Sequence, residues 1–348
     1  MQKYFNITES TKIFILTPAG VVTGGVELLH QLCDVLNRNG ANAYIVYQNK
    51  ENKEIPDDYK KYNIKIADNY IDAEENIVVV PEVYIYKIPH IKKSQLLIWW
   101  MSVDNYFYNS QGSFLDNIKF SFKFGIESFI KRFIKQVFYR QKSKKYSIKK
   151  LKNNVLVCCH ACQSAYALDF LKNKGFQNLE MLSDYINEDY VFSTILMENK
   201  KNNVLYNPKK GIKFTKKLIK AAPELNWIPI KNMTRAEVRQ NMNNAKVYID
   251  FGYHPGKDRM PREAAMCGCC IITGKLGAAG YQQDLSIEKE YKFNQTKRDI
   301  IKIVNKIRFE LSNYETEIVK FEDYRAKISN EKKLFERDAL QLLTHNRF

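Results

Sequence analysis

Short apolar runs alternate along the chain with segments in which apolar residues recur at helical spacing. The first such pair is the run "KIFILTPAG" at 12–20 and the segment that follows Gly24 and Gly25 and ends at Gly40. In that segment the apolar positions are three or four residues apart: Val26, Leu29, Leu32, Cys33 and Leu36. With the next apolar run, "NAYIVYQ" at 42–48, this order predicts parallel strands joined by right-handed crossovers.

The same order continues to about residue 285. Further apolar runs in the first half lie at 76–84, 95–103 and 153–161. The second half repeats the order without repeating the sequence, with the segments 178–187, 202–211, 212–222, 226–233, 235–245, 246–253, 261–266 and 269–274. We therefore predict an α/β protein of two doubly wound domains, which also suits a length of 348 residues. Ligands bind beyond the carboxyl ends of such strands, so we expect a site in a central cleft that both domains face.

Positive charge is concentrated in one segment that does not fit the alternation of strands and helices. Lys and Arg outnumber Asp and Glu by 55 to 38, and a formal charge of +17 attracts nucleic acid, anionic lipid or phosphorylated small molecules. Residues 114–150 hold eleven Lys or Arg against Asp116 and Glu127, which is +9 of that total. Apolar residues recur there near helical spacing, with cations between them: Leu115, Ile118, Phe122, Phe129, Ile130, Phe133 and Val137. A basic amphipathic helix is typical of a segment that lies in an anionic membrane interface.

Two other interpretations of this insertion stay open. Its apolar face could pack in a core, or its cations could bind nucleic acid. The phenylalanines form a stripe rather than a stacking platform in a sheet, so we expect no nucleic acid partner. The N-terminus lacks the pattern of a signal peptide, and no run of about eighteen apolar residues exists. We expect a cytoplasmic protein, peripheral at the inner face of the membrane.

The seven cysteines suit reduced thiols better than disulfides, because they are odd in number and clustered. Cys158, Cys159 and Cys162 form one group, and a second follows at 267–270. Together they could be imagined as a zinc site. However, Cys159 and Cys162 lie where a strand passes into a helix, where free thiols act as small buried apolar groups. We predict packing, and no metal.

Candidate chemistry gathers in "GYHPGKDRMPREAAMCGCCIIT" at 252–273. Lys257, Arg259 and Arg262 fall just before and within the first turn of the helix around Glu263. Cations beside free amides at a helix start form a phosphate or diphosphate site, and Glu263 can reach a ribose or sugar hydroxyl. The alternative is a solvated run of charges before a core helix. Gly24 and Gly25, before another helix, let the backbone approach a ligand, although such a pair can also be structural.

Three motifs carry a resemblance to a known family. They are Gly24-Gly25-Val26-Glu27, the sequence Lys209-Lys210-Gly211, and Glu263-Ala264 leading to "CGCCII". Together they resemble the GT-B glycosyltransferases of the glycosyl transferases group 1 type. The resemblance implies two Rossmann-like domains: an N-terminal domain on the acceptor side at 1–180 and a nucleotide-sugar domain at 181–313. It also implies C-terminal helices at 314–348 that return to the first domain.

The resemblance implies roles for single residues. Lys210 would contact the donor diphosphate, Glu263 would bind the nucleotide ribose, and Gly25 would lie by the phosphates or the sugar. Lys209 and His254 join these as substrate-binding candidates. The chain departs from the family pattern at Pro255, where a glutamate should stand, and its extra cations favour a strongly anionic donor.

We therefore expect a metal-independent glycosyltransferase with no cofactor, which agrees with the lack of a D-x-D motif. Its partners would be a nucleotide-sugar donor and a lipid-linked or cell-surface polysaccharide acceptor. Candidates for an acceptor base are Asp104, His160 and Glu27, and Asp104 could instead cap the segment after it. Two alternatives remain: an inactive GT-B-like protein that binds membrane or nucleic acid, and a nucleotide-sugar epimerase.

Overall fold

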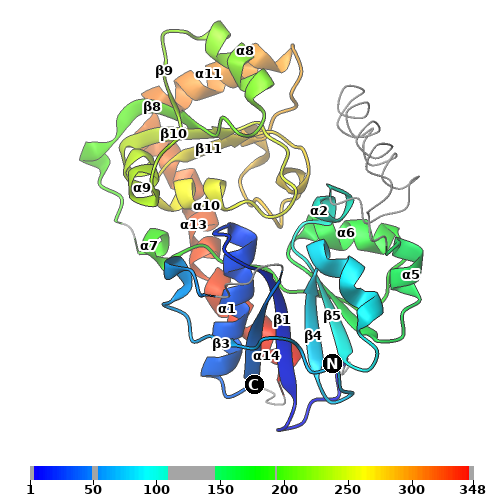
Figure 1. Cartoon of the computed structure of the whole chain (residues 1–348). Coiled ribbons are helices and arrows are strands. Elements are labelled where there is room, and N and C mark those ends of the chain that lie inside the picture. Colours follow the sequence, from blue (N-terminus) through cyan, green and yellow to red (C-terminus); the bar gives the residue numbers. More distant parts are fainter. Residues whose placement is uncertain (1–3, 49–53, 109–145, 193, 345–348) are drawn as a thin grey trace. The chain divides into compact units, whose positions relative to one another are not determined.

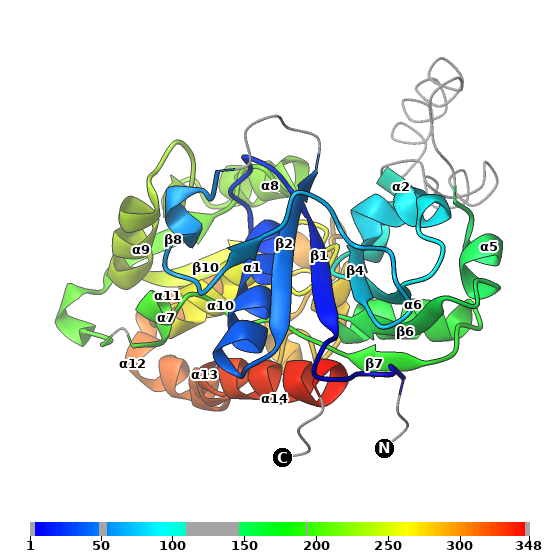
Figure 2. The same ribbon diagram turned by 60° about the horizontal axis from the view of Figure 1, so that its bottom comes forward.

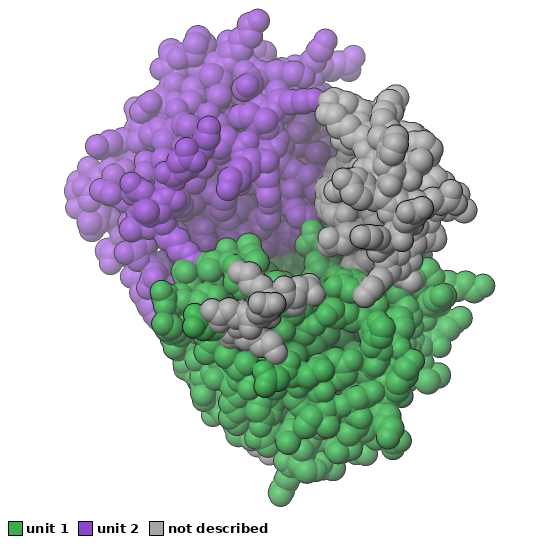
Figure 3. Space-filling model, viewed as in Figure 1, with its two compact units in different colours: residues 1–163, 167–183, 335–348 green, residues 164–166, 184–334 purple. Residues whose placement is uncertain are grey.

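The computed structural model describes residues 4–48, 54–108, 146–192 and 194–344. The chain forms two compact units (Figures 1 and 3). Unit 1 comprises residues 1–163, 167–183 and 335–348, and unit 2 comprises residues 164–166 and 184–334. The sequence predicted boundaries at 180/181 and 313/314. In the structure, the helices after residue 313 are divided between the units at 334/335.

Unit 1 is built on a seven-stranded parallel sheet with the order β3-β2-β1-β4-β5-β6-β7. Its strands are β1 (Lys12–Pro18), β2 (Asn42–Gln48), β3 (Lys65–Ile66), β4 (Ile77–Pro81), β5 (Gln95–Trp100), β6 (Val157–Cys162) and β7 (Leu179–Met181). Ile13 on β1 pairs with Ala43 on β2 and with Ile77 on β4, which fixes the register of the centre. Every residue of β4 is buried, because both faces of a parallel sheet of this kind are covered.

Helices cover the sheet of unit 1. They are α1 (Gly24–Arg38), α2 (Val103–Tyr108), α5 (Ile148–Lys152), α6 (Ala165–Asn173) and most of α14 (Glu331–Leu343), with the 3₁₀ helices η1 (Asp57–Tyr59) and η2 (Glu82–His90). Figure 2 shows α1 against the adjacent strands β1 and β2. The apolar stripe predicted for this helix, from Val26 to Leu36, is buried.

Unit 2 has a four-stranded parallel sheet with the order β11-β10-β8-β9. Its strands are β8 (Lys201–Tyr206), β9 (Asn226–Pro229), β10 (Ala245–Asp250) and β11 (Cys270–Thr273). Its helices are α7 (Glu188–Val191), α8 (Ile212–Ala221), α9 (Arg235–Asn244), α10 (Arg259–Met266), α11 (Asp299–Ser312), α12 (Tyr314–Glu317) and α13 (Glu322–Ser329). Its 3₁₀ helices are η3 (Met197–Asn199), η4 (Ala278–Gly280), η5 (Lys289–Tyr291) and η6 (Ile318–Phe321). Figure 1 shows α8 and α11 on one face of this sheet and α9 and α10 on the other.

The predicted strands and helices are present, with one misplacement. The segment 178–187 was grouped with the second half of the chain, with the domain boundary at 180/181, whereas Leu179–Met181 form β7 at the edge of the first sheet. His160 on β6 pairs with Leu179, so the strand continues the parallel order of unit 1. A three-residue edge strand has too few positions to show in the apolar pattern which sheet it joins.

The cysteines behave as packing residues. All seven are free thiols, of which Cys158 is half-buried and the other six are buried. Burial raises the pKa of the Cys162 thiol to about 12. Among the residues that the structure describes, no cysteine joins a group of metal-capable side chains. The zinc alternative therefore has no support in this part of the chain.

Most of the predicted amphipathic insertion at 114–150 lies outside the described residues, and its membrane role stays a prediction. Its last residues begin α5, whose first turn is capped by the Ser147 hydroxyl. Within the described ranges, no helix is both long and apolar enough to cross a membrane.

Candidate functional site

The strand order of unit 2 defines where a ligand is expected. The order reverses between β8 and β10, and in open α/β sheets ligands bind at the carboxyl ends of strands at such a switch point. The loop 207–211 follows β8 there, and the loop 251–258 follows β10. The two loops touch at their backbones: a Cβ on Gly211, whose φ is +61°, would lie 2.2 Å from the carbonyl oxygen of Phe251. Glycine is therefore required at this contact.

A third loop, which follows β11, is held in the same way. Gly277 has a φ of +68°, and a Cβ on it would lie 2.0 Å from the carbonyl oxygen of His254. The His254 amide donates to the Leu276 carbonyl at 3.2 Å, and the Ala278 amide donates to the His254 carbonyl at 2.9 Å. Three loops at one edge of the sheet are thus fixed by backbone contacts.

The helices that begin at this edge have no side-chain caps. Neither Gly211 before α8 nor Asp258 before α10 accepts a hydrogen bond from its helix through a side chain. By contrast, α9 has a complete capping box formed by Thr234 and Glu237. The first amides of a helix carry partial positive charge and lack partners within the helix. The starts of α8 and α10 can therefore bind an anion.

A chain of charges links the β8 and β10 loops. Lys210 Nζ lies 2.5 Å from Asp258 Oδ2, and His254 Nδ1 lies 3.2 Å from the same oxygen. On the other side of the ring, His254 Nε2 lies 3.4 Å from Asp250 Oδ1. Asp250 also accepts hydrogen bonds from the Gly252 amide and the Tyr248 hydroxyl, at 2.9 and 3.1 Å. The series of charged side chains from Lys210 to Asp250 is therefore fixed at the switch point.

The two carboxylates beside His254 favour the protonated form of its ring. Burial by itself would lower its pKa, but the charges of Asp250 and Asp258 outweigh burial and the pKa lies above its ordinary value. Burial likewise opposes the charge of Asp250, yet the His254 charge keeps the pKa of Asp250 below its usual range. Asp250, His254 and Asp258 form the one metal-capable group found among the described residues, with ligand atoms within 4.8 Å of one another.

The arrangement of Asp250, His254 and Asp258 favours a protonated histidine ring between two carboxylates over a bound metal ion. A metal ion binds one nitrogen of an imidazole ring, whereas the two carboxylates here lie at opposite nitrogens. Asp258 is also already paired with the Lys210 ammonium. The two carboxylates therefore lie on opposite sides of the His254 ring instead of converging on one of its nitrogens.

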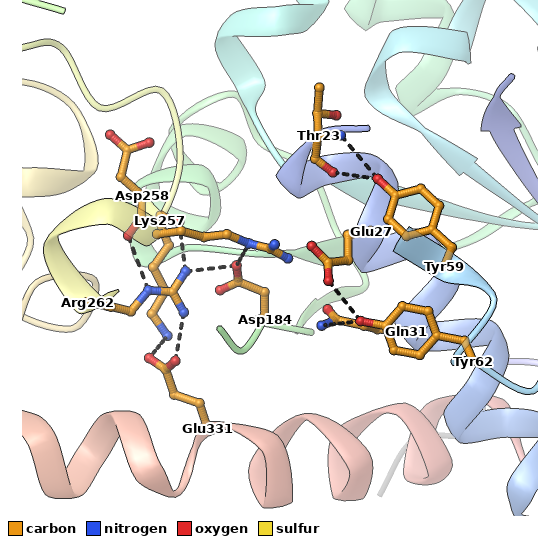
Figure 4. Close-up of polar contacts among 11 residues, drawn as sticks. Thr23, Glu27, Gln31, Tyr59, Tyr62, Asp184, Lys257, Asp258, Arg262 and Glu331 are labelled. Carbon is orange, nitrogen blue, oxygen red and sulfur yellow. Dashed lines mark hydrogen bonds and ion pairs between the residues drawn. The ribbon is translucent and has the colours of Figure 1, made fainter. Parts of the chain in front are cut away.

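The three cations of the predicted phosphate cluster are paired inside unit 2 (Figure 4). Arg262 is fully buried, with NH1 2.7 Å from Glu331 Oε2 and NH2 2.8 Å from Asp184 Oδ2. Lys257 Nζ lies 2.7 Å from Glu331 Oε1, and Arg259 Nε lies 4.0 Å from Asp184 Oδ2. Within unit 2, these three cations therefore lie against the same two carboxylates, Asp184 and Glu331.

This pairing changes the interpretation of the cluster. Arg262 was expected to address phosphate, but a guanidinium with no exposed surface and two carboxylate partners has a structural place. The expectation of a strongly anionic donor stays a prediction. Lys209, by contrast, is exposed on the β8 loop, and Glu263 is half-buried on α10.

The switch point of unit 1 lies between β1 and β4. Gly24 and Gly25 begin α1 there, and Thr23 before them gives the helix no side-chain cap. The Thr23 amide donates to the Tyr59 hydroxyl at 3.1 Å, which anchors the loop (Figure 4). Glu27 is buried and accepts a hydrogen bond from the Tyr62 hydroxyl at 2.9 Å.

The three candidates for an acceptor base are all buried: Asp104, His160 and Glu27 are 0%, 5% and 2% exposed. His160 Nδ1 accepts a hydrogen bond from Trp100 Nε1 at 3.2 Å, and burial lowers the pKa of His160 to about 3. Asp104 lies in the first turn of α2. The role of an acceptor base stays a prediction for all three residues.

Comparison with known proteins was made at the level of sequence and of structure. No protein-family model and no curated protein sequence matches the chain. Solved structures match it at low identity over almost its whole length. HepE from Anabaena, solved with UDP and glucose, has a TM-score of 0.59 at 11% identity over 95% of each chain. WaaG, a glycosyltransferase involved in lipopolysaccharide biosynthesis, has a TM-score of 0.58 at 11% identity over 95% of this chain and 99% of its own.

A third match is sucrose-phosphate synthase from Thermosynechococcus elongatus, with a TM-score of 0.52 at 11% identity over 96% of this chain and 95% of its own. These solved structures are GT-B glycosyltransferases. The chain has the GT-B fold. The α/β architecture of two Rossmann-like units predicted from the sequence is therefore confirmed, whereas the central cleft concerns how the units are arranged and stays a prediction.

Within this GT-B fold, the predicted site residues fall into one set in each unit. In unit 2 the structure brings Lys210 and His254 together, and it gathers Lys257, Arg259 and Arg262. Sequence reasoning missed the carboxylates that organise both groups: Asp184, Asp250, Asp258 and Glu331. Asp258 is the N-cap residue of α10, which begins at Arg259, two residues before the predicted start at Pro261, and an Asp near a predicted helix start is a signal that could have found it.

Sequence reasoning also missed a buried carboxyl in unit 1. Glu82 follows β4 at the switch point and accepts hydrogen bonds from the Met101 amide and the Asn105 side chain, both at 3.1 Å. Burial raises the pKa of Glu82 to about 7. Both of these donors come from the residues at the start of α2.

Proposed function

We propose that the protein is a glycosyltransferase that moves a sugar from a nucleotide-diphosphate donor to an acceptor hydroxyl without a metal ion. The observation that carries this proposal is the switch point of unit 2. Two uncapped helix starts and the Lys210 ammonium meet there on backbone-fixed loops. The GT-B fold supports the same class of reaction.

The proposed chemistry concerns the leaving group. As the bond from the anomeric carbon to the donor oxygen breaks, negative charge develops on the diphosphate. The free amides of α8 and α10 and the charge of Lys210 would stabilise it in place of a metal ion. By the family resemblance, Glu263 on α10 would bind the ribose. Lys209, which is exposed on the same loop as Lys210, would add long-range attraction for the donor.

The donor is proposed to be a UDP-sugar. HepE was solved with UDP-glucose and with UDP and glucose, and TarM of S. aureus was solved with UDP.

The acceptor is proposed to be lipid-linked or a cell-surface polysaccharide. The basic, phenylalanine-rich segment 114–150 supports this, because it would hold the enzyme on the anionic inner face of a membrane where such acceptors lie. WaaG, which matches in fold, is itself involved in lipopolysaccharide biosynthesis. Gly24, Gly25 and Asp104 stay predictions for the acceptor-side unit.

Nucleotide binding tests the proposal directly. Melting temperature is measured with UDP, GDP, ADP and CMP, because a ligand at about 100 times its Kd stabilises the fold by about 2.7 kcal/mol. UDP should raise the melting temperature of the wild type, and Lys210→Met should abolish the rise. Lys217→Met removes an exposed lysine from the body of α8 and should leave the rise intact.

The outcomes separate the alternatives. If no nucleotide changes the melting temperature, the donor site is wrong. If UDP binds but no UDP-sugar is hydrolysed or transferred, the protein is an inactive GT-B-like binder. Formation of an isomeric sugar, with no acceptor present and without net hydrolysis to the free sugar, would instead indicate an epimerase.

A further inference from the structure

The Arg262 guanidinium on α10 makes four hydrogen bonds with no exposed surface (Figure 4). Two go to the carboxylates Glu331 and Asp184, at 2.7 and 2.8 Å. The other two go to backbone carbonyls of the preceding loop, from Nε to Asp258 at 3.2 Å and from NH2 to Lys257 at 3.1 Å. The planar fork therefore fixes the loop between β10 and α10 as well as balancing charge.

The loop that Arg262 fixes carries the partner of Lys210. Asp258 offers its carbonyl to Arg262 and its carboxylate to Lys210 and His254. Asp258 thus contacts both the buried guanidinium of Arg262 and the ammonium group of Lys210 at the switch point. A displacement of the Asp258 backbone would move the carboxylate that holds Lys210.

The carboxylates that hold Arg262 come from two of the four places where the chain crosses between the units. Asp184 is the first residue of unit 2 after the crossing at 183/184, and Glu331 lies just before the crossing at 334/335. Lys257 from the same loop binds the second oxygen of Glu331 at 2.7 Å. The β10–α10 loop is therefore anchored to both of these chain segments.

Stability alone does not explain this network. Moving charges out of water is costly, and replacing buried ion pairs by apolar side chains of similar size is often neutral or stabilising. An apolar residue at position 262 would pack α10 without any charge. What the arginine adds is the set of directed bonds to Lys257 and Asp258.

We propose that Arg262 is a positioning residue for the donor site, which acts through Asp258 to hold Lys210 where a nucleoside diphosphate binds. This inference rests on the proposed function. It gives Arg262 a role in donor binding without contact between its side chain and the donor.

Two variants separate positioning from charge compensation. Arg262→Lys keeps the charge but has one compact donor group in place of the fork, so a role limited to charge balance predicts wild-type behaviour. Arg262→Met with Asp184→Asn removes a cation and an anion together and keeps the Lys257–Glu331 pair, so no new net charge is buried. Arg308→Met with Glu224→Gln removes an arginine–carboxylate pair elsewhere in unit 2 and serves as the control.

Two measurements are made on each full-length variant: amide hydrogen exchange of residues 252–260 without ligand, and the Kd for UDP. Positioning predicts faster exchange in this segment and at least about a tenfold weaker Kd for both Arg262 variants. The melting temperature of the double variant should stay near that of the wild type, and the Arg308 control should change neither measurement.

Unchanged exchange and unchanged UDP affinity in Arg262→Lys would overturn the inference, even if the double variant does not fold. If the wild type binds no UDP, the proposed function fails, and exchange alone decides whether Arg262 positions the loop. Faster exchange confined to 252–260 would then show that Arg262 holds the loop but not that the loop binds a donor, and unchanged exchange would overturn the inference.

Discussion

Buried histidines in the two units respond to pH with opposite sign. In unit 1, burial lowers the pKa of His30 to about 4 and that of His160 to about 3. The indole N–H of Trp100 is only a donor, so His160 Nδ1 must accept and the ring is neutral. In unit 2, two carboxylates raise the pKa of His254. Its contribution to stability is full below the unfolded value of about 6.5 and is lost as the pH rises through its folded value.

The sign for His30 and His160 gives a residue-scale prediction. Between about pH 6.5 and 4 the unfolded chain binds protons that these folded rings do not, so stability falls as the pH falls. His160→Gln retains an acceptor for Trp100 but does not titrate. It should therefore reduce the slope of unfolding free energy against pH by about 1 kcal/mol per pH unit between pH 6.5 and 5.

Urea unfolding followed by tryptophan fluorescence at several pH values measures this slope. The absolute loss of stability in the variant does not matter, since only the pH dependence is compared. An unchanged slope would show that His160 is not held neutral in the folded protein.

The site could be predicted from the sequence only where neighbours in the chain determine it. Lys210 was identified by the family resemblance, through the motif Lys209-Lys210-Gly211, and it lies at the switch point. Arg262 was given to phosphate because it lies in the first turn of a predicted helix. Its partners Asp184 and Glu331 are 78 and 69 residues away in the chain, so no local pattern shows that it is buried.

At the scale of elements, helix starts in unit 2 are closed or open according to their side chains. Thr234 and Glu237 close α9, while Gly211 leaves α8 open and Asp258 gives its carboxylate to Lys210 and His254 instead of to α10. Capped helices gain stability from their own side chains. Open helices keep donors for a ligand at the expense of that stabilisation.

This difference predicts separate effects of substitution. Thr234→Ala removes the capping box of α9 and should lower the free energy of unfolding by about 1 kcal/mol. The Kd for UDP should stay unchanged, because α9 is not one of the open helices. Urea unfolding and UDP titration on the same preparation test both parts, and a weakened UDP affinity would contradict the distinction between open and closed helix starts.

Elements with many periodic positions were predictable, and short ones were not. The runs that became β1, β2, β4 and β5 are long enough for the apolar pattern to identify a buried parallel strand. By contrast, β7 has three residues, and its sheet is decided by pairing with β6 rather than by its own sequence. The division of α14 between the units is likewise a matter of tertiary packing, with Phe335 stacked on Trp99 at 6.2 Å.

For the whole molecule, the uneven charge predicts where it associates. About half of the +17 lies in 114–150, so membrane binding should depend on this segment rather than on total charge. Neutralising Lys119, Lys131 and Lys135 to Gln should strongly reduce sedimentation with vesicles that contain about 30% phosphatidylglycerol. The same loss of charge at the exposed α8 residues Lys216, Lys217 and Lys220 is the control and should have little effect.

Phosphatidylcholine vesicles without anionic lipid supply the second comparison. Little binding is expected there, because attraction between the cations and anionic headgroups is missing. Equal sedimentation with both vesicle types, or equal losses in the two triple variants, would refute a membrane role for this segment.

The glycine contacts at the edge of unit 2 bear on how such a protein diverges. Gly211 and Gly277 join three loops through main-chain atoms, and the proposed anion site consists largely of main-chain amides. Main-chain groups are the same whatever side chain they carry. Most positions in these loops can therefore accept different side chains without loss of the main-chain contacts. A chain can then keep the GT-B architecture at 11% identity to HepE and WaaG. The same tolerance leaves few shared residues for a sequence comparison to detect.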